Sequence, residues 1–142
     1  MTARTLRFDE VEIGDALPPL EVPITTTLIV AGAIASRDYQ EVHHDRDLAR
    51  ARGAPDIFMN ILTTNGLVGR FVTDWAGPDA RLELVDIRLG VPNHPGDSMH
   101  ISGRVRAKSE PEGLVEVELV GRNRLGDHVT GTVRLTLPRS GG

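Results

Sequence analysis

The chain has 142 residues and contains no cysteine. This absence excludes a disulfide framework, a thiol nucleophile and a cysteine-ligated iron–sulfur cluster, and it suits a reducing compartment. The longest apolar run, Leu28–Ala35, is far too short to cross a bilayer. The N-terminal residues show no apolar stretch of the kind that secretion signals carry. We therefore expect a cytoplasmic protein.

Positive charge is scarce as well. Sixteen Lys and Arg residues stand against twenty Asp and Glu residues, which gives a net charge of −4. This balance argues against nucleic acid as the main partner. The chain also has no GxGxxG, P-loop, GxSxG or HExxH motif. It thus gives no support for a nucleotide cofactor, a serine hydrolase triad or a zinc protease, and we expect neither a metal nor a cofactor.

Helical signals lie in the first half of the chain, whose length is typical of one domain spanning residues 1–142. Thr26 or Thr27 can cap a short helix through Leu28–Ala35. A further helical turn or two is expected at Asp47–Arg52. The stretch between these two helices has no clean period and is expected to be a loop.

A longer helix is predicted within Ile57–Trp75, with Asp56 as its N-cap. Its apolar residues cover most of the helix circumference, and this pattern is typical of a buried helix. Gly77 and Pro78 end it.

Beyond this helix, apolar and polar residues alternate, as in half-buried antiparallel strands. The strand predicted at Leu82–Leu89 changes phase at Leu84-Val85, which suggests a β-bulge. The order of elements indicates an α+β fold in which one antiparallel sheet wraps around one buried helix. A sheet this small covers only one side of the helix, so we expect a dimer that completes the sheet.

The polar residues that can carry chemistry concentrate around Asp38 and His43. A carboxylate and an imidazole held close together can bind one water, take a proton from it and supply a proton elsewhere. Spacing alone also allows a structural interpretation, in which Asp38 caps a turn and His43 satisfies a backbone group. A metal site at His43, His44 and Asp45 is disfavoured because adjacent histidines rarely point at the same ion. Arg46 and Arg50 lie four residues apart and can meet a ligand phosphate or simply form a solvated face.

These residues resemble the MaoC-like hydratases, a family with the hotdog fold. The family signature, roughly Gly-Asp-x-Asn-Pro-x-His, aligns with Arg37–His43, where the Asp and the His match and the Gly, Asn and Pro do not. The resemblance extends over nearly the whole chain. Within the family, the sequence is most similar to the small catalytic subunit of steroid side-chain enoyl-CoA hydratases in cholesterol-degrading actinobacteria. The later motifs that carry it are Arg88, Pro92, Pro95-Gly96-Asp97, Gly103-Arg104-Val105, Asn123, Gly126-Asp127, Val129 and Leu137-Pro138.

The resemblance implies a hotdog domain that adds water to the α,β double bond of a steroid side-chain enoyl-CoA, giving a 3-hydroxyacyl-CoA. Asp38 and His43 would be the catalytic residues. A backbone N–H of Met59 or Asn60 would stabilise the thioester oxyanion, since a helix start presents free donors there. The implied partner is a second MaoC-like subunit, in a heterodimer or heterotetramer that links to an aldolase.

Three alternatives stay open on the sequence. The chain can be a hotdog acyl-CoA thioesterase, in which a carboxylate and a helix N-terminus drive hydrolysis. It can be a non-catalytic scaffold subunit that completes a partner's pocket. It can also be a homodimeric hydratase acting on plain fatty acyl chains. The His near Asp38 favours a hydratase over a thioesterase, and retention of both side chains argues against a scaffold. Replacement of the usual Gly, Asn and Pro, which reshapes the loop at the pocket mouth, argues against a plain fatty acyl substrate.

Overall fold

The computed structural model describes residues 3–141. Within this range no helix is both long and apolar enough to span a membrane. In chain order the elements are the short 3-10 helix η1 (Phe8–Glu10), β1 (Leu20–Pro23), α1 (Thr26–Ala35), the 3-10 helix η2 (Glu41–His43), α2 (Arg46–Ala51), α3 (Ile61–Ala76), β2 (Arg81–Leu89), β3 (Ser98–Ser109), β4 (Leu114–Asn123) and β5 (Gly126–Thr136).

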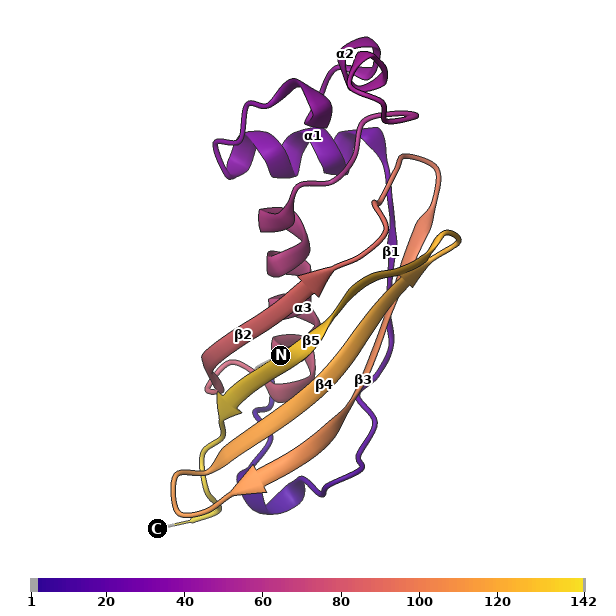
Figure 1. Ribbon diagram of the computed structural model, residues 1–142. Helices are drawn as coiled ribbons and strands as arrows, with labels where there is room; N and C mark the ends of the chain where they lie inside the picture. The colour runs from indigo at the N-terminus through magenta and orange to yellow at the C-terminus, as the bar shows by residue number, and fades with distance from the viewer. Residues whose placement is uncertain (1–2, 142) are drawn as a thin grey trace.

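The five strands form one antiparallel sheet in the order β1-β3-β4-β5-β2. Strands β3, β4 and β5 are neighbours in sequence and in space, whereas β2 joins the far side of β5. The sheet therefore ends on β2 at one edge and on the four-residue β1 at the other (Figure 1). The register between β2 and β5 shifts between Leu82 and Leu84, which confirms the predicted bulge close to its expected place.

Helix α3 packs against one face of this sheet, and Figure 1 shows it behind the strands. The alternating valines and leucines of β4 and β5 point toward it, as the period-two pattern predicts. Phe71 of α3 lies over Gly103, where a Cβ atom would approach the Phe71 ring to 3.1 Å. The expected arrangement of one sheet around one helix is thus confirmed.

The start of α3 differs from the prediction. Asp56 is not its N-cap: the helix begins at Ile61, and Asn60 caps it by accepting a hydrogen bond from the Thr63 N–H. The intervening backbone at 57–59 is not helical, and distant segments bind it. The Phe58 N–H donates to the Val42 carbonyl and the Met59 N–H to that of Asn93. These partners are 16 and 34 residues away, so no local signal reveals them.

The two shorter helices follow the prediction with small shifts. Helix α1 is capped by Thr25, which accepts from the Leu28 N–H, rather than by Thr26 or Thr27. Helix α2 begins at Arg46, one residue before the expected start, because Asp45 caps it. Helix α1 lies across the upper end of α3 in Figure 1, so the loop after α1 comes close to the N-terminus of α3.

Candidate active site

The structure brings Asp38 and His43 into direct contact at the N-terminal end of α3. Asp38 follows α1 and His43 ends η2, and the distance from Asp38 Oδ2 to His43 Nε2 is 3.2 Å. His43 is buried, while about a quarter of the Asp38 side chain is exposed. Both line a cavity of about 290 Å³ whose wall consists of Asp38, His43, Phe58, Met59, Asn60, Ile61, Leu89, Gly90, Val91, Pro92 and His128.

A sharp turn of the backbone presents Asp38 to this cavity. Arg37 has a φ of 57°, in the left-handed region, and the Asp38 N–H donates to the Ala33 carbonyl at 2.9 Å. Glycine adopts such a φ without a steric penalty. The glycine of the family signature stands at the position of Arg37, so this chain keeps the turn while changing the residue.

The orientation of the His43 ring is fixed from its other side. Nδ1 lies 2.7 Å from the carbonyl oxygen of Phe58, and the Phe58 ring meets the imidazole edge-on at 5.2 Å between centroids. A carbonyl oxygen can only accept, so Nδ1 carries the proton of the neutral ring. Nε2 is therefore the nitrogen that can exchange a proton, and it is the one that faces Asp38.

Asp38 is held in its ionised form by hydrogen bonds. The pKa of its carboxyl lies below the ordinary value, chiefly because the Asn60 amide donates to it, and further because of the Gln40 N–H and the nearby His43; partial desolvation opposes these effects. Asn60 Nδ2 lies 3.1 Å from Asp38 Oδ2. The contact with Asn60 connects the carboxylate to the N-cap residue of α3, a link that the sequence does not reveal.

The two backbone donors predicted for the oxyanion are not equivalent. The Met59 N–H already donates to the Asn93 carbonyl at 3.1 Å, which makes Met59 a poor candidate. The Asn60 N–H makes no hydrogen bond within residues 3–141 and lies at the N-cap of α3, beside the cavity. Of the predicted pair, Asn60 is the donor that remains for a ligand.

His128 is a cavity residue that sequence analysis missed. It is 2% exposed, with Nδ1 at 2.6 Å from the Val91 carbonyl and Nε2 at 2.8 Å from Thr64 Oγ1. Burial lowers the pKa of its imidazole below the ordinary value, against a smaller opposite effect of the Val91 hydrogen bond. Val129 and Val133 of β5 face inward, so strict alternation predicts that position 128 faces solvent. The sequence pattern therefore does not predict a buried histidine there.

The predicted phosphate-binding arginines lie apart from this cavity. Arg46 and Arg50 are exposed on α2, and Arg50 Nε donates to the Pro55 carbonyl at 3.0 Å. Neither lines the cavity, so their contact with coenzyme A stays a prediction. In the described part of the chain no three His, Asp or Glu side chains are grouped to hold a metal ion.

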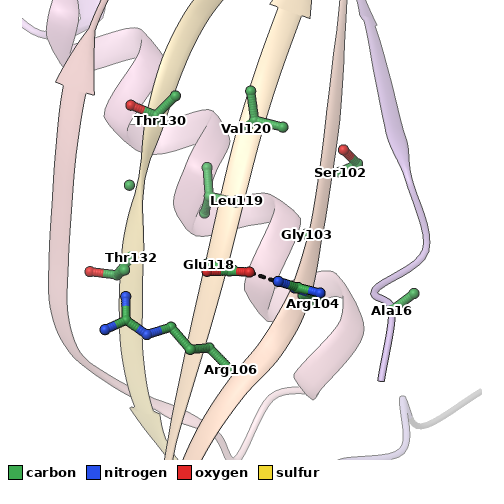
Figure 2. A pocket seen from close by; sticks show the side chains of 11 residues that line it. Ala16, Ser102, Gly103, Arg104, Arg106, Glu118, Leu119, Val120, Thr130 and Thr132 are labelled. Carbon is green, nitrogen blue, oxygen red and sulfur yellow. Dashed lines mark hydrogen bonds and ion pairs between the residues drawn. The ribbon is translucent and has the colours of Figure 1, made fainter. Parts of the chain in front are cut away.

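A second hollow, of about 630 Å³, lies on the face of the sheet opposite α3 (Figure 2). Its charged residues come from neighbouring strands, and Figure 2 shows the ion pair between Arg104 and Glu118. Arg106 is paired with Glu116 at 3.5 Å. No histidine lines this second hollow, so the hollow lacks the acid–base chemistry of the smaller cavity.

No protein-family model matches the chain, but individual proteins of known identity are similar to it in sequence and in structure. The chain is 53% identical over 125 residues to the "3-oxo-4,17-pregnadiene-20-carboxyl-CoA hydratase beta subunit" of Mycobacterium tuberculosis (strain ATCC 25618 / H37Rv), covering 88% of this chain and 95% of that protein. It is 52% identical, with a TM-score of 0.86, to a chain in the crystal structure of the ChsH1-ChsH2 complex from Mycobacterium tuberculosis, covering 89% and 98% of the two chains.

The fold is shared more widely than the sequence. The R-hydratase PhaJ1 from Pseudomonas aeruginosa superposes with a TM-score of 0.87 at 20% identity, covering 96% of this chain and 88% of that one. This likeness confirms the expected hotdog architecture. At 53% identity over most of both chains, the family expected from the sequence motifs is also confirmed. The chain belongs to the MaoC-like hydratase family.

Proposed function

We propose that this chain is the catalytic subunit of an enoyl-CoA hydratase that adds water to the α,β double bond of a steroid side-chain enoyl-CoA. The observation that carries the proposal is the contact between Asp38 and His43 inside a cavity, in a chain 53% identical to a pregnadiene carboxyl-CoA hydratase subunit. The product is the 3-hydroxyacyl-CoA. A coenzyme A substrate also suits the cytoplasmic location predicted above.

The first chemical step activates water. A water on the cavity side of the Asp38–His43 contact reaches both side chains. His43 Nε2 takes a proton from this water, because Nδ1 is committed to the Phe58 carbonyl. The water oxygen then bonds to the β carbon of the substrate, and the π electrons move to the thioester oxygen. The Asp38 carboxylate orients the water and stabilises the imidazolium.

The second step stabilises the enolate that forms and then protonates it. The Asn60 N–H, at the start of α3, donates to the thioester oxygen as its negative charge develops. A proton returns from the Asp38–His43 pair to the α carbon, so that one molecule of water is added in all. A single donor of this kind typically accounts for about 3 kcal/mol of barrier lowering.

A partner subunit completes the site. The cavity of about 290 Å³ lies at the lower limit of pockets for drug-sized ligands, which are roughly 300–1,000 Å³. The chain exposes 8178 Å², whereas a compact monomer of this mass exposes about 7,200 Å² by area scaling. Large apolar side chains are exposed on α3 and on the helix side of the edge strand β2, namely Ile61, Leu62, Leu82 and Leu89. We infer that a second MaoC-like subunit pairs with β2 and covers this surface.

The catalytic pair is tested by substitution. The Asp38→Asn and His43→Ala variants, each copurified with the second subunit, should fold and assemble as the unaltered chain does. Each should lose hydration of 3-oxo-4,17-pregnadiene-20-carboxyl-CoA by about 10²- to 10⁴-fold, the usual contribution of a positioned acid or base. The assay follows loss of the conjugated enoyl absorbance. Near wild-type rates in either variant contradict the mechanism.

The same assay distinguishes the alternatives. Release of free coenzyme A thiol indicates a thioesterase, whereas loss of enoyl absorbance without thiol indicates a hydratase. A complex that stays active after both side chains are replaced indicates a scaffold role for this chain. Faster turnover of crotonyl-CoA than of the steroid thioester indicates a fatty acyl substrate.

A further inference from the structure

We propose that the Asn60 side chain is a positioning residue for the Asp38–His43 pair. Its amide oxygen caps α3, and its amide nitrogen holds the Asp38 carboxylate against His43, so the helix start and the pair form one hydrogen-bonded unit. This role is separate from that of the Asn60 backbone N–H. The inference rests on the proposed function for its catalytic consequence.

The orientation of the amide follows from its partners. Asn60 Oδ1 lies 3.0 Å from the backbone nitrogen of Thr63 and 2.6 Å from Thr63 Oγ1. A backbone N–H can only donate, so the amide oxygen must face Thr63. The NH2 group is thereby directed to the opposite side, toward α1 and the loop that follows it.

Both protons of that NH2 group are used. One is donated to Ser36 Oγ at 2.9 Å and the other to Asp38 Oδ2 at 3.1 Å. The Ser36 hydroxyl has its own acceptor in the Gly32 carbonyl at 2.7 Å, so its lone pairs are free for Asn60. Asn60 is 2% exposed. A flipped amide would lose these bonds in a buried place, which makes the observed orientation the stable one.

One carboxylate oxygen of Asp38 therefore lies between the Asn60 amide and the His43 imidazole. Asp38 Oδ2 accepts from Asn60 and also faces His43 Nε2 at 3.2 Å. The titratable side chain that faces Asp38 is His43, from η2, whereas Ser36 from α1 and Asn60 from α3 are neutral. An amide N–H stabilises a carboxylate more than a carboxylic acid. Hydrogen bonding to Asn60 is also the largest of the effects that lower the pKa of Asp38.

The decisive variant is Asn60→Asp. A carboxylate keeps the helix cap, since Asp is as good an N-cap as Asn. It replaces the NH2 group with an oxygen beside Asp38, and two adjacent carboxylates raise each other's pKa. In the assembled complex, with 3-oxo-4,17-pregnadiene-20-carboxyl-CoA, kcat should fall by about 10- to 100-fold with little change in KM. The acidic limb of the kcat/KM profile should move to higher pH.

A second variant and a control separate positioning from folding. Asn60→Ser also keeps a capping oxygen but adds no charge, and it should lower kcat with a smaller movement of the acidic limb. Thr25→Ala removes the N-cap of α1 on an exposed site away from the cavity. It should lower the free energy of unfolding by about 1 kcal/mol and leave both kcat and the pH profile unchanged.

A pH titration of the Asp38 carboxyl carbon by ¹³C NMR tests the contact between Asn60 and Asp38 independently of catalytic activity. Its pKa should rise in Asn60→Ser and rise further in Asn60→Asp. An unchanged Asp38 titration together with an unmoved acidic limb in both variants overturns the inference, even if kcat falls. Wild-type complex that hydrates no steroid thioester contradicts the proposed function instead, and the NMR titration still decides whether Asn60 holds Asp38.

Discussion

Arg37 shows how a single residue can depart from the family signature while the site keeps its shape. Its φ of 57° is the conformation for which the signature uses glycine. The hydrogen bond from the Asp38 N–H to Ala33 closes the turn, so Asp38 still reaches the cavity. The two signature residues that this chain retains, Asp38 and His43, are those whose side chains meet.

The buried His128 makes stability depend on pH. Burial lowers its pKa below the ordinary value, so below about pH 6.5 the unfolded chain binds a proton that the folded chain does not. The free energy of unfolding should therefore fall as the pH decreases from 6.5 toward the folded-state pKa. We expect the His128→Gln variant to lose less stability than wild type between pH 7.5 and 5.5, measured by urea denaturation.

Thr64→Val provides the control for this prediction. It removes the hydroxyl that contacts His128 Nε2 but keeps the imidazole. This variant should be less stable than wild type at both pH values, with the pH dependence retained. Parallel stability curves for wild type and His128→Gln would falsify the assignment of the dependence to His128.

Among the elements, the close approach of α1 to α3 sets the distance between Asp38 and Asn60. Gly32 of α1 allows this approach, because a Cβ atom there would lie 2.2 Å from Thr63 Oγ1 and 2.9 Å from Thr63 Cγ2. The same hydroxyl contacts Asn60 Oδ1 at 2.6 Å. A larger residue at position 32 must displace Thr63, and through it the cap of α3.

Gly32→Ala should therefore destabilise the protein. In an ordinary helix interior this change stabilises by about 0.5–1 kcal/mol, whereas overpacking costs about 1–3 kcal/mol. We expect the second effect to dominate, with a lower free energy of unfolding and slower hydration. Urea denaturation and the enoyl absorbance assay measure the two effects.

The double variant Gly32→Ala, Thr63→Ala tests the cause. Removing the Thr63 side-chain branches creates room for the new methyl group. The double variant should be more stable than the sum of the two single effects predicts, as contacting residues usually behave in such cycles. Additive effects would show that Thr63 is not what Gly32 accommodates.

At the scale of the whole molecule, the edge strand β2 is where association with a partner is expected. An edge strand presents unpaired backbone donors and acceptors, and this one also exposes Leu82, Leu84 and Leu89. Leu82 lies beside α3, where its Cδ1 would be 3.7 Å from a Cβ atom on Gly69. Leu82 pairs with the inward-facing Leu135, so it lies on the helix side of the sheet and forms one apolar surface with α3. Leu84 pairs with the exposed Arg134 and lies on the opposite side.

A charge on this edge should prevent assembly. Leu82→Arg places a guanidinium on the surface that we expect the partner to bury, and a buried unpaired charge is strongly unfavourable. Native mass spectrometry of the coexpressed subunits should then show separate chains at micromolar concentration. Leu125→Arg is the matched control, because Leu125 is 53% exposed in the turn between β4 and β5. Assembly that survives Leu82→Arg places the interface elsewhere.

The sequence by itself determined the sheet, the long helix and the identity of the Asp–His pair. Strand periodicity is a local property, since alternate side chains face the core whatever the rest of the chain does. The predicted burial of the long helix is wrong for one side of it in the single chain, because Ile61 and Leu62 are exposed while Val68, Phe71 and Val72 are buried. The motifs around Asp38 and His43 are sufficient to indicate the family.

Tertiary structure alone decided where α3 begins, which backbone donor stays free, and how Asn60 and His128 take part in the site. Each of these features depends on a hydrogen bond between residues far apart in sequence: Met59 to Asn93, Asn60 to Asp38, and His128 to Thr64. Buried polar groups must find partners, but which partners they find depends on how the segments pack. Local sequence patterns carry no information about that packing.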